Sequence, residues 1–277
     1  MNALNRQSRI ALAVIGAFTL VALTAPWLSP FRHDFIDWQH LAVPPDFGSA
    51  HWLGTDRLGR DLFARGMQAL RVSLLIGLVS ALVSVFIGVA WGAVAGYIGG
   101  RLDAVMMRFV DIVYALPYVF IVIILSTMFE RGSLSALVLA IGAVGWLTMA
   151  RIVRGQTLSL RRREFIDAAI VSGMNTPRIL WRHIVPNVAG PVIAYATLTI
   201  PQMILFESFL SFLGLGVQEP FASLGSLINE GAHEMESSPW MLLVPAGLLT
   251  ILLIAFNLLG DGLRARLDAS SRSARDE

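Results

Sequence analysis

The sequence predicts an all-α membrane protein with six membrane-spanning helices. Of its 277 residues, 56% are hydrophobic and only 14% are charged, and the mean hydropathy is +0.68. Long apolar runs alternate with short charged segments, which is typical of a chain that crosses a bilayer several times. The runs are continuously apolar and do not alternate at period two, so they favour helices over the strands of a membrane barrel.

Six uncharged stretches approach or exceed the roughly 20 residues that a helix needs to cross about 30 Å of hydrocarbon. They are 10–31, 72–100, 112–129, 134–150, 188–206 and 237–260. The first stretch resembles a secretory signal, but no A-x-A-like cleavage site follows its apolar core, so we expect a retained anchor. Pro117, Pro201 and Pro245 lie within predicted spans and are expected to kink them.

The arginines indicate which helix ends face the cytoplasm, because cytoplasmic loops carry an excess of basic residues. Placing both termini in the cytoplasm also puts most of the 21 basic residues there. The outward segments are then 32–71, the turn with Arg131, and 213–239, the last with four glutamates and no arginine. We therefore expect cytoplasmic termini and a cytoplasmic segment 161–187.

This topology divides the chain into three parts. Residues 1–71 comprise the first helix and an external segment, and residues 72–261 form the transmembrane domain. Residues 262–277 form a cytoplasmic tail, whose polar composition predicts disorder.

Lysine and cysteine are both absent from the sequence. Without cysteine the chain has no disulfide, thiolate metal site or thiol nucleophile of its own. A phosphate-binding P-loop requires a lysine, so any ATP-driven work must come from another polypeptide. The arginines follow membrane topology and do not form the stripes of a nucleic-acid binder. We expect no catalytic residue, no cofactor and no nucleic-acid partner.

The polar segment 164–187 predicts two short helices joined by a turn. An apolar face at helical spacing marks the first helix and comprises Phe165, Ile166, Ala169 and Ile170. Gly173 stands where a glycine after a helix allows a left-handed turn. The second helix is expected to begin with Thr176 as N-cap and Pro177 at its first position, and to end at Pro186.

The segment has two interpretations on physical grounds alone. Arginines 161–163 place its start at the membrane surface, where it could lie as an interfacial helix without a partner. Alternatively, it could be a lever that docks onto another protein. Residues alone leave both interpretations open.

Residues 167–186, DAAIVSGMNTPRILWRHIVP, resemble the EAA signature of ABC-importer permeases. The acid is aspartate instead of glutamate, and the RHIVPN ending departs from the commonest form. Residues 51–74, 102–117 and 207–220 resemble segments of the C-type subunits of oligopeptide and dipeptide permeases. On this resemblance the chain is identified as a peptide-type permease subunit with the type I ABC importer fold.

The resemblance implies that 164–187 contains the coupling helix, which seats in a groove of a cytoplasmic ATPase. The candidate docking residues are Glu164, Asp167, Ala168, Ala169, Gly173, Met174 and Pro177. It further implies a homologous second permease subunit, two cytoplasmic ABC ATPases, an external solute-binding protein and a bacterial inner-membrane location. The solute would be a di- or oligopeptide, with nickel or another small solute as the alternative. An ion-gradient transporter and an anchor without a pore remain as other classes.

Further candidates lie within the spans. A stripe of small residues at every fourth position predicts close helix packing, within the subunit or against a second permease. Its members are Ser80, Ser84, Gly88, Gly92 and Gly96. Asp111 and Glu207 interrupt or border apolar runs, so they should face the solute path or pair within the bundle, Asp111 for instance with Arg108.

Two polar segments are expected outside the spans. His33, Asp37 and His40 have a spacing that one helix face could present to a metal, but no further ligand stands close in sequence. We therefore expect a solvated loop and no metal site. The same expectation applies to 230–234, whose acidic character suits contact with a solute-binding protein.

Overall fold

The structure is a computed structural model that describes residues 5–127 and 133–276. Within these ranges the backbone consists of helices and their connecting loops, which confirms the predicted all-α membrane fold. Arg131, which the topology places outside, lies beyond the described residues.

Five helical segments of the described chain are long and apolar enough to cross a membrane. They are α1 (Arg6–Leu28), α2 (Leu62–Ile98), α5 (Leu134–Leu160), the continuous segment Thr176–Phe212 and α10 (Trp240–Asp276). α10 begins before the predicted tail and continues past residue 262. The apolar part of the helix nucleates the residues that follow it, each of which then adds one further hydrogen bond.

The predicted span 112–129 is not one kinked helix. It forms parts of α3 (Gly100–Ala115) and α4 (Tyr118–Thr127), whose axes are bent by 89°. The break falls at Leu116 and Pro117, because proline lacks the N–H that would continue the helix and biases the preceding residue toward extended backbone. If the bent pair counts as one span, the described helices reach the predicted total of six.

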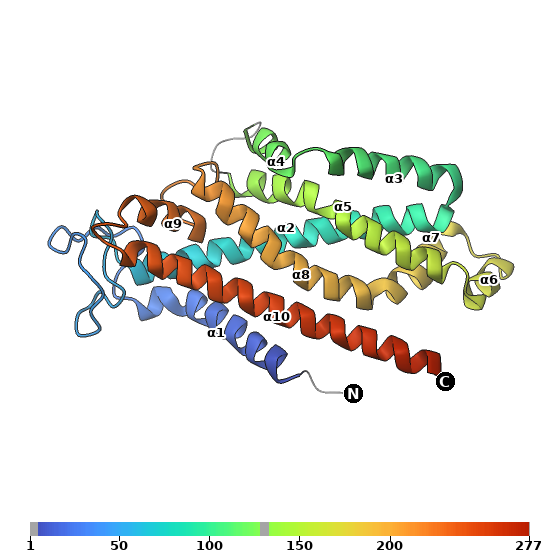
Figure 1. Cartoon of the computed structure of the whole chain (residues 1–277), viewed down its shortest axis with the longest axis horizontal. Coiled ribbons are helices and arrows are strands. Elements are labelled where there is room, and N and C mark those ends of the chain that lie inside the picture. The colour runs from blue at the N-terminus through green and yellow to red at the C-terminus, as the bar shows by residue number, and fades with distance from the viewer. Residues whose placement is uncertain (1–4, 128–132, 277) are drawn as a thin grey trace.

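α2, α5 and α8 (Val185–Phe212) form the centre of the bundle (Figure 1). α1 and α10 pack side by side on one flank, and α3 and α4 lie on the other. Three buried apolar clusters run along this centre.

The predicted stripe of small residues sets the close approach of α2 to α5. All five side chains or glycines of the stripe are buried. Ser80 and Ser84 donate hydrogen bonds to the carbonyls of Val138 (3.3 Å) and Gly142 (3.1 Å) of α5. At the next position, a Cβ added to Gly88 would lie 2.6 Å from the Cβ of Met149. The stripe therefore packs within the chain, which favours the first of the two expected roles.

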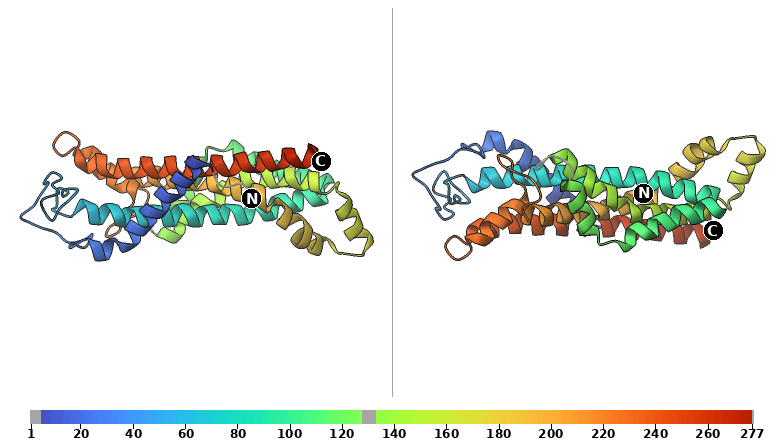
Figure 2. Two further views of the ribbon diagram at one scale, coloured as in Figure 1. Left: turned by 90° about the horizontal axis from the view of Figure 1, so that it is seen from below. Right: turned by 90° about the horizontal axis from the view of Figure 1, so that it is seen from above.

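The two ends of the bundle differ in what they carry. One end holds the connecting segment 29–61 and α9 (Leu224–His233). The opposite end holds α6 (Glu164–Val171), α7 (Thr176–Ile179) and the last turns of α10 (Figure 1). The α6–α7 hairpin projects beyond the bundle in both further views (Figure 2).

Candidate functional site

The α6–α7 hairpin turns at Gly173. The backbone of Gly173 has φ +79°, the left-handed conformation that the sequence predicts there. The N–H groups of Gly173 and Met174 donate to the carbonyls of Ile170 (2.9 Å) and Ala169 (3.1 Å), which closes the end of α6. A Cβ on Gly173 would meet no atom within 4 Å, so the turn requires glycine for its conformation and not for space.

The second arm begins one residue earlier than predicted. Asn175 is the N-cap, and its side-chain oxygen accepts a hydrogen bond from the N–H of Arg178 at 3.2 Å. Thr176 is already the first helical residue, with Pro177 after it. The Thr176 assignment was wrong because asparagine is the stronger cap and reaches the exposed N–H groups from the preceding position.

Pro186 does not end the second arm. A π-helical turn, η1 (Leu180–Ile184), joins α7 to α8, and the N–H of Val185 donates to the carbonyl of Leu180. This wider turn changes the hydrogen-bonding register just before Pro186, which then lies in the first turn of α8 where a missing N–H is tolerated. One helical segment therefore extends from Thr176 in the hairpin to Phe212 in the bundle.

The predicted apolar face of α6 divides between buried and exposed positions. Ile166 and Ala169 are 0% and 4% exposed, and both belong to the apolar cluster that includes Ile179 of α7. Phe165 and Ile170 are 40% and 52% exposed. Ala169 therefore anchors α6 to its own chain and leaves no side-chain surface for a partner.

The remaining predicted docking residues lie mainly on the outer surface of the hairpin. Met174 is half-buried, and those that are exposed are Glu164, Asp167, Ala168, Gly173 and Pro177. Val171 was not predicted and is 88% exposed at the tip. Its position one turn after Ala168 and two turns after Glu164 on one helix face could have revealed it. Val171 and Ala168 therefore share an exposed face of α6 with the acids Glu164 and Asp167.

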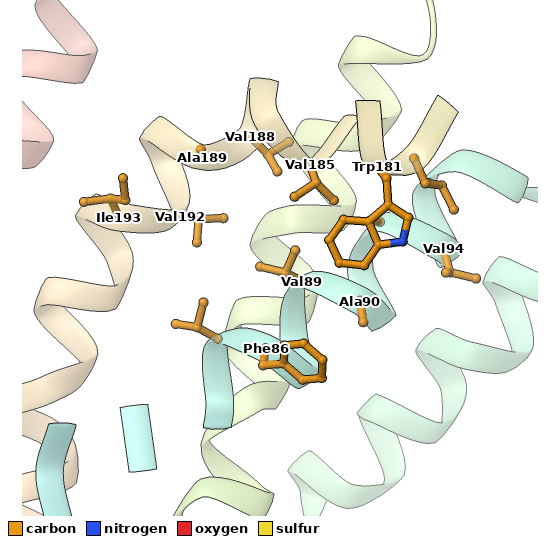
Figure 3. A pocket seen from close by; sticks show the side chains of 13 residues that line it. Phe86, Val89, Ala90, Val94, Trp181, Val185, Val188, Ala189, Val192 and Ile193 are labelled. Atoms are coloured by element: carbon orange, nitrogen blue, oxygen red, sulfur yellow. The ribbon is translucent and has the colours of Figure 1, made fainter. Parts of the chain in front are cut away.

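An apolar groove of about 420 Å³ opens beside the second arm (Figure 3). It lies between α2, which contributes Phe86, and the η1–α8 segment, which contributes Trp181 and Ile193. Phe86 and Trp181 are 72% and 70% exposed. The groove therefore presents large exposed apolar side chains next to the second arm of the hairpin.

The acid Asp111 pairs across helices and not with Arg108 as predicted. Its Oδ1 accepts a hydrogen bond from Nη2 of Arg151 at 2.8 Å, and the Arg151 guanidinium also lies 4.4 Å from the ring centre of Tyr114. A partner from α5 was hidden from the sequence because the approach of α3 to α5 is set by the fold.

A second arginine–aspartate pair joins the same two helices. Nη2 of Arg154 donates to Oδ2 of Asp103 at 2.6 Å, and its Nε donates to the other carboxylate oxygen. Neither residue was among the predicted candidates. The sequence could have indicated this pair, because Arg151 and Arg154 are three residues apart on α5 and so share a helix face.

Glu207 is fully buried within the bundle and touches serine hydroxyls. Ser211 and Ser73 donate to its two carboxylate oxygens at 2.7 Å each, and Ser208 lies 3.4 Å away. Ser73 belongs to α2 and also accepts the N–H of Leu224 at the start of α9. This geometry favours the bundle role over the solute path, because the carboxylate fastens α8 to α2 and α9.

The segment 230–234 is not a solvated loop. Most of it belongs to α9, and the carboxylate of Glu230 accepts two hydrogen bonds from the buried Arg65 at 2.6 and 2.9 Å. Arg65 also donates to Asp56 at 2.6 Å. The expectation failed because the partner charges lie far away in sequence and come together only at this end of the bundle.

The chain matches known transport proteins along most of its length. Residues 88–273 match the family described as "Binding-protein-dependent transport system inner membrane component". The oligopeptide transport system permease protein OppC of Escherichia coli (strain K12) is 54% identical over 97% of this chain and 88% of its own length. The dipeptide transport system permease protein DppC of Bacillus subtilis (strain 168) is 42% identical over 98% of this chain and 86% of its own.

A solved structure shares the fold. A chain of the inward-facing MetNI methionine ABC transporter aligns with a TM-score of 0.59 over 71% of this chain and 94% of its own, at 18% identity. At that identity the likeness concerns the fold alone. The extent and identity of the sequence matches place this chain in the family of binding-protein-dependent transport system inner membrane components.

Proposed function

We propose that this chain is a permease subunit of an ATP-driven importer for di- or oligopeptides. The observation that carries the proposal is the projecting α6–α7 hairpin, found in a chain 54% identical to an oligopeptide transport system permease protein. The hairpin gives such a permease a place to receive force. The alternative solute is nickel or another small molecule, and the sequence relatives named for oligopeptides and dipeptides favour peptides.

The hairpin serves as the docking element for a cytoplasmic ATPase. Its outer surface, where Ala168 and Val171 share an exposed face of α6 with Glu164 and Asp167, is free to enter a groove. Its inner surface, with Ile166, is packed on the chain, so the hairpin would move as one body with the bundle.

The continuous helix from Thr176 to Phe212 transmits that movement. A displacement of the hairpin tip would tilt this helix, because its first turns form the second arm of the hairpin and continue without a break into the bundle centre. Rigid-body tilting of packed helices is a common form of conformational switching. The solute path would then open alternately toward the two sides of the membrane.

The orientation follows from the same assignment. The hairpin end faces the cytoplasm together with both termini, and the end with 29–61 and α9 faces outward toward a solute-binding protein. The transmembrane domain is 72–261. A homologous second permease subunit completes the path, and two ATPase subunits supply ATP hydrolysis for a chain that lacks the P-loop lysine.

Reconstitution tests the proposal. The chain is placed in proteoliposomes with its companion permease, the ATPases and the binding protein, and uptake of a labelled oligopeptide is measured with and without ATP. ATP-dependent uptake is expected. Uptake that follows an imposed ion gradient without ATP would instead indicate a secondary transporter, and no uptake by an intact assembly would indicate an anchor.

A variant pair isolates the docking surface. Ala168→Glu places a charge on the exposed face of α6, whereas Ala50→Glu places the same charge on an exposed alanine at the opposite end. We expect Ala168→Glu to lose co-purifying ATPase subunits and Ala50→Glu to retain them. Equal retention by both variants would contradict docking at α6. Ala169 is unsuitable for this test because it is buried against its own chain.

A further inference from the structure

Three metal-binding side chains meet in the segment that precedes α2. Asp37, His40 and His51 each offer a ligand atom, and the three atoms lie within 4.8 Å of one another. His33, which the sequence grouped with Asp37 and His40, is not one of the three. His51 takes that place because the segment folds back before α2 begins.

His51 is held in one orientation by its surroundings. The residue is 3% exposed, and its ring stacks on Phe31 with 4.3 Å between ring centres and 12° between planes. Its Nδ1 lies 3.0 Å from Oδ2 of Asp61, which is 2% exposed. Oδ1 of Asp61 is committed to the N–H of Ala64 as the cap of α2. In metal-binding histidines, the N–H of the ring nitrogen that does not bind the metal commonly donates to a carboxylate in this way.

The other ring nitrogen of His51 is buried and has no hydrogen-bond partner in the described part of the chain. This Nε2 lies 3.5 Å from Oδ2 of Asp37. When the Nδ1–H of His51 donates to Asp61, Nε2 is a lone-pair acceptor that faces a second acceptor. Such an arrangement is repulsive unless a cation lies between the two atoms.

The backbone holds the carboxylate of Asp37 in place. The N–H of Gln39 donates to Oδ1 of Asp37 at 3.0 Å, which leaves the other carboxylate oxygen for a ligand. The Oδ2 of Asp37 lies 2.9 Å from Nδ1 of His40, so one oxygen faces both imidazole rings.

We propose that Asp37, His40 and His51 bind one divalent transition-metal ion, with Zn²⁺ the best match, and that Asp61 orients His51. Two imidazole nitrogens and one carboxylate oxygen are a ligand set that zinc accepts, with water in the fourth position. Donor atoms bound at about 2.0–2.1 Å in a tetrahedron stand about 3.3 Å apart. The separations of 2.9 and 3.5 Å around Asp37 Oδ2 lie on either side of that value.

A metal at this position fastens the segment 37–40 to the start of α2 through His51 and the capping residue Asp61. The site lies at the end of the bundle opposite the α6–α7 hairpin. Its role is to fix the shape of the loop surface there. This role does not depend on the proposed transport of peptides or on ATPase docking.

Metal analysis of the full chain, purified in detergent without chelators, tests the site. We expect about one equivalent of zinc per chain by elemental analysis, and tight binding in competition with a chromophoric zinc chelator. Added Co²⁺ should give the visible absorption of a tetrahedral site. His40→Gln removes a partly exposed ligand and should weaken zinc binding at least about tenfold, whereas His33→Gln is the matched histidine control and should bind as the wild type does.

Asp61→Asn probes the orienting carboxylate without removing the helix cap, because asparagine caps as well as aspartate. With Oδ1 kept on Ala64, its amide group would face Nδ1 of His51 and favour the tautomer protonated at Nε2, which cannot bind metal. The expected loss of zinc affinity is about 10–100-fold. Two results would overturn the proposal: no zinc bound at micromolar zinc, which would mean that a proton alone joins His51 to Asp37, or equal affinities for His40→Gln and His33→Gln.

Discussion

Replacement of Gly92 by alanine should destabilise the α2–α5 contact measurably. A Cβ at Gly92 would lie 2.4 Å from the carbonyl oxygen of Ala150 and 2.9 Å from the amide nitrogen of Arg154. Both atoms belong to the backbone, so no side-chain rotation can relieve the overlap. An ordinary van der Waals contact would require the two helices to move apart by about 1 Å. The close packing of α2 on α5 over four helical turns opposes that movement.

Overpacking of this kind lowers the free energy of unfolding by about 1–3 kcal/mol. Alanine in place of a glycine inside a helix raises it by up to about 1 kcal/mol. The net loss should be on the order of 1–2 kcal/mol, a shift of several degrees in the apparent melting temperature. Intrinsic fluorescence of the purified chain during heating measures this shift.

Gly155→Ala is the matched control, because Gly155 lies in α5 with nothing within 4 Å of an added Cβ. It should be as stable as the wild type or more so. An unchanged melting temperature for Gly92→Ala, or an equal loss for Gly155→Ala, would refute the assignment of the stripe to packing within the chain.

Two further predictions concern polar contacts. Ser73→Ala should lower the stability by about 1–3 kcal/mol, because it leaves the buried partners of the hydroxyl unsatisfied. Ser208→Ala should lower it less, because the Ser208 hydroxyl is 3.4 Å from Glu207. Equal losses on thermal unfolding would contradict this account. The hydrogen bond from Arg60 lowers the pKa of the Glu219 carboxyl below its ordinary 4.5. The contribution of this pair to the stability of the folded chain should therefore be complete above about pH 4.5 and disappear as the pH falls through the lowered pKa. The difference in melting temperature between wild type and Glu219→Gln should follow that course, and a difference that grows on acidification would show the sign to be wrong.

The span count and the hairpin turn were accessible from the sequence because each rests on local information. Continuous apolar length predicts a membrane helix whatever surrounds it. Gly173 adopts the conformation that few other residues tolerate, so its position alone predicted the turn.

Local signals failed where the tertiary fold decides the outcome. Pro117 was visible, but the 89° bend between α3 and α4 was not. Pro186 was interpreted as a stop because its missing N–H was counted without the π turn that accommodates it. Arg151, the partner of Asp111, and His51, which joins Asp37 and His40, are both remote in sequence. Spacing along one helix therefore pointed to Arg108 and His33 instead.

The division of α6 into an anchored and a free face was also hidden. Periodicity places Ile166, Ala169 and Ile170 on one apolar face, but only packing shows which side of it the chain itself covers. The resemblance marked Ala168 and Ala169 together, and the structure separates them into an exposed and a buried position. Docking experiments should therefore use Ala168 and the tip residue Val171.

The cysteine-free sequence allows the central claim to be tested with one thiol at a time. Ala168→Cys, with Ala50→Cys as its counterpart at the opposite end, is exposed to a membrane-impermeant maleimide in vesicles of each orientation, with and without the ATPase subunits. The account predicts that the thiol at position 168 reacts only from the cytoplasmic side and is protected when the ATPases are bound, while the thiol at position 50 reacts only from outside. Labelling of position 168 from the outside, or full reactivity there in an assembled transporter that hydrolyses ATP, would contradict it.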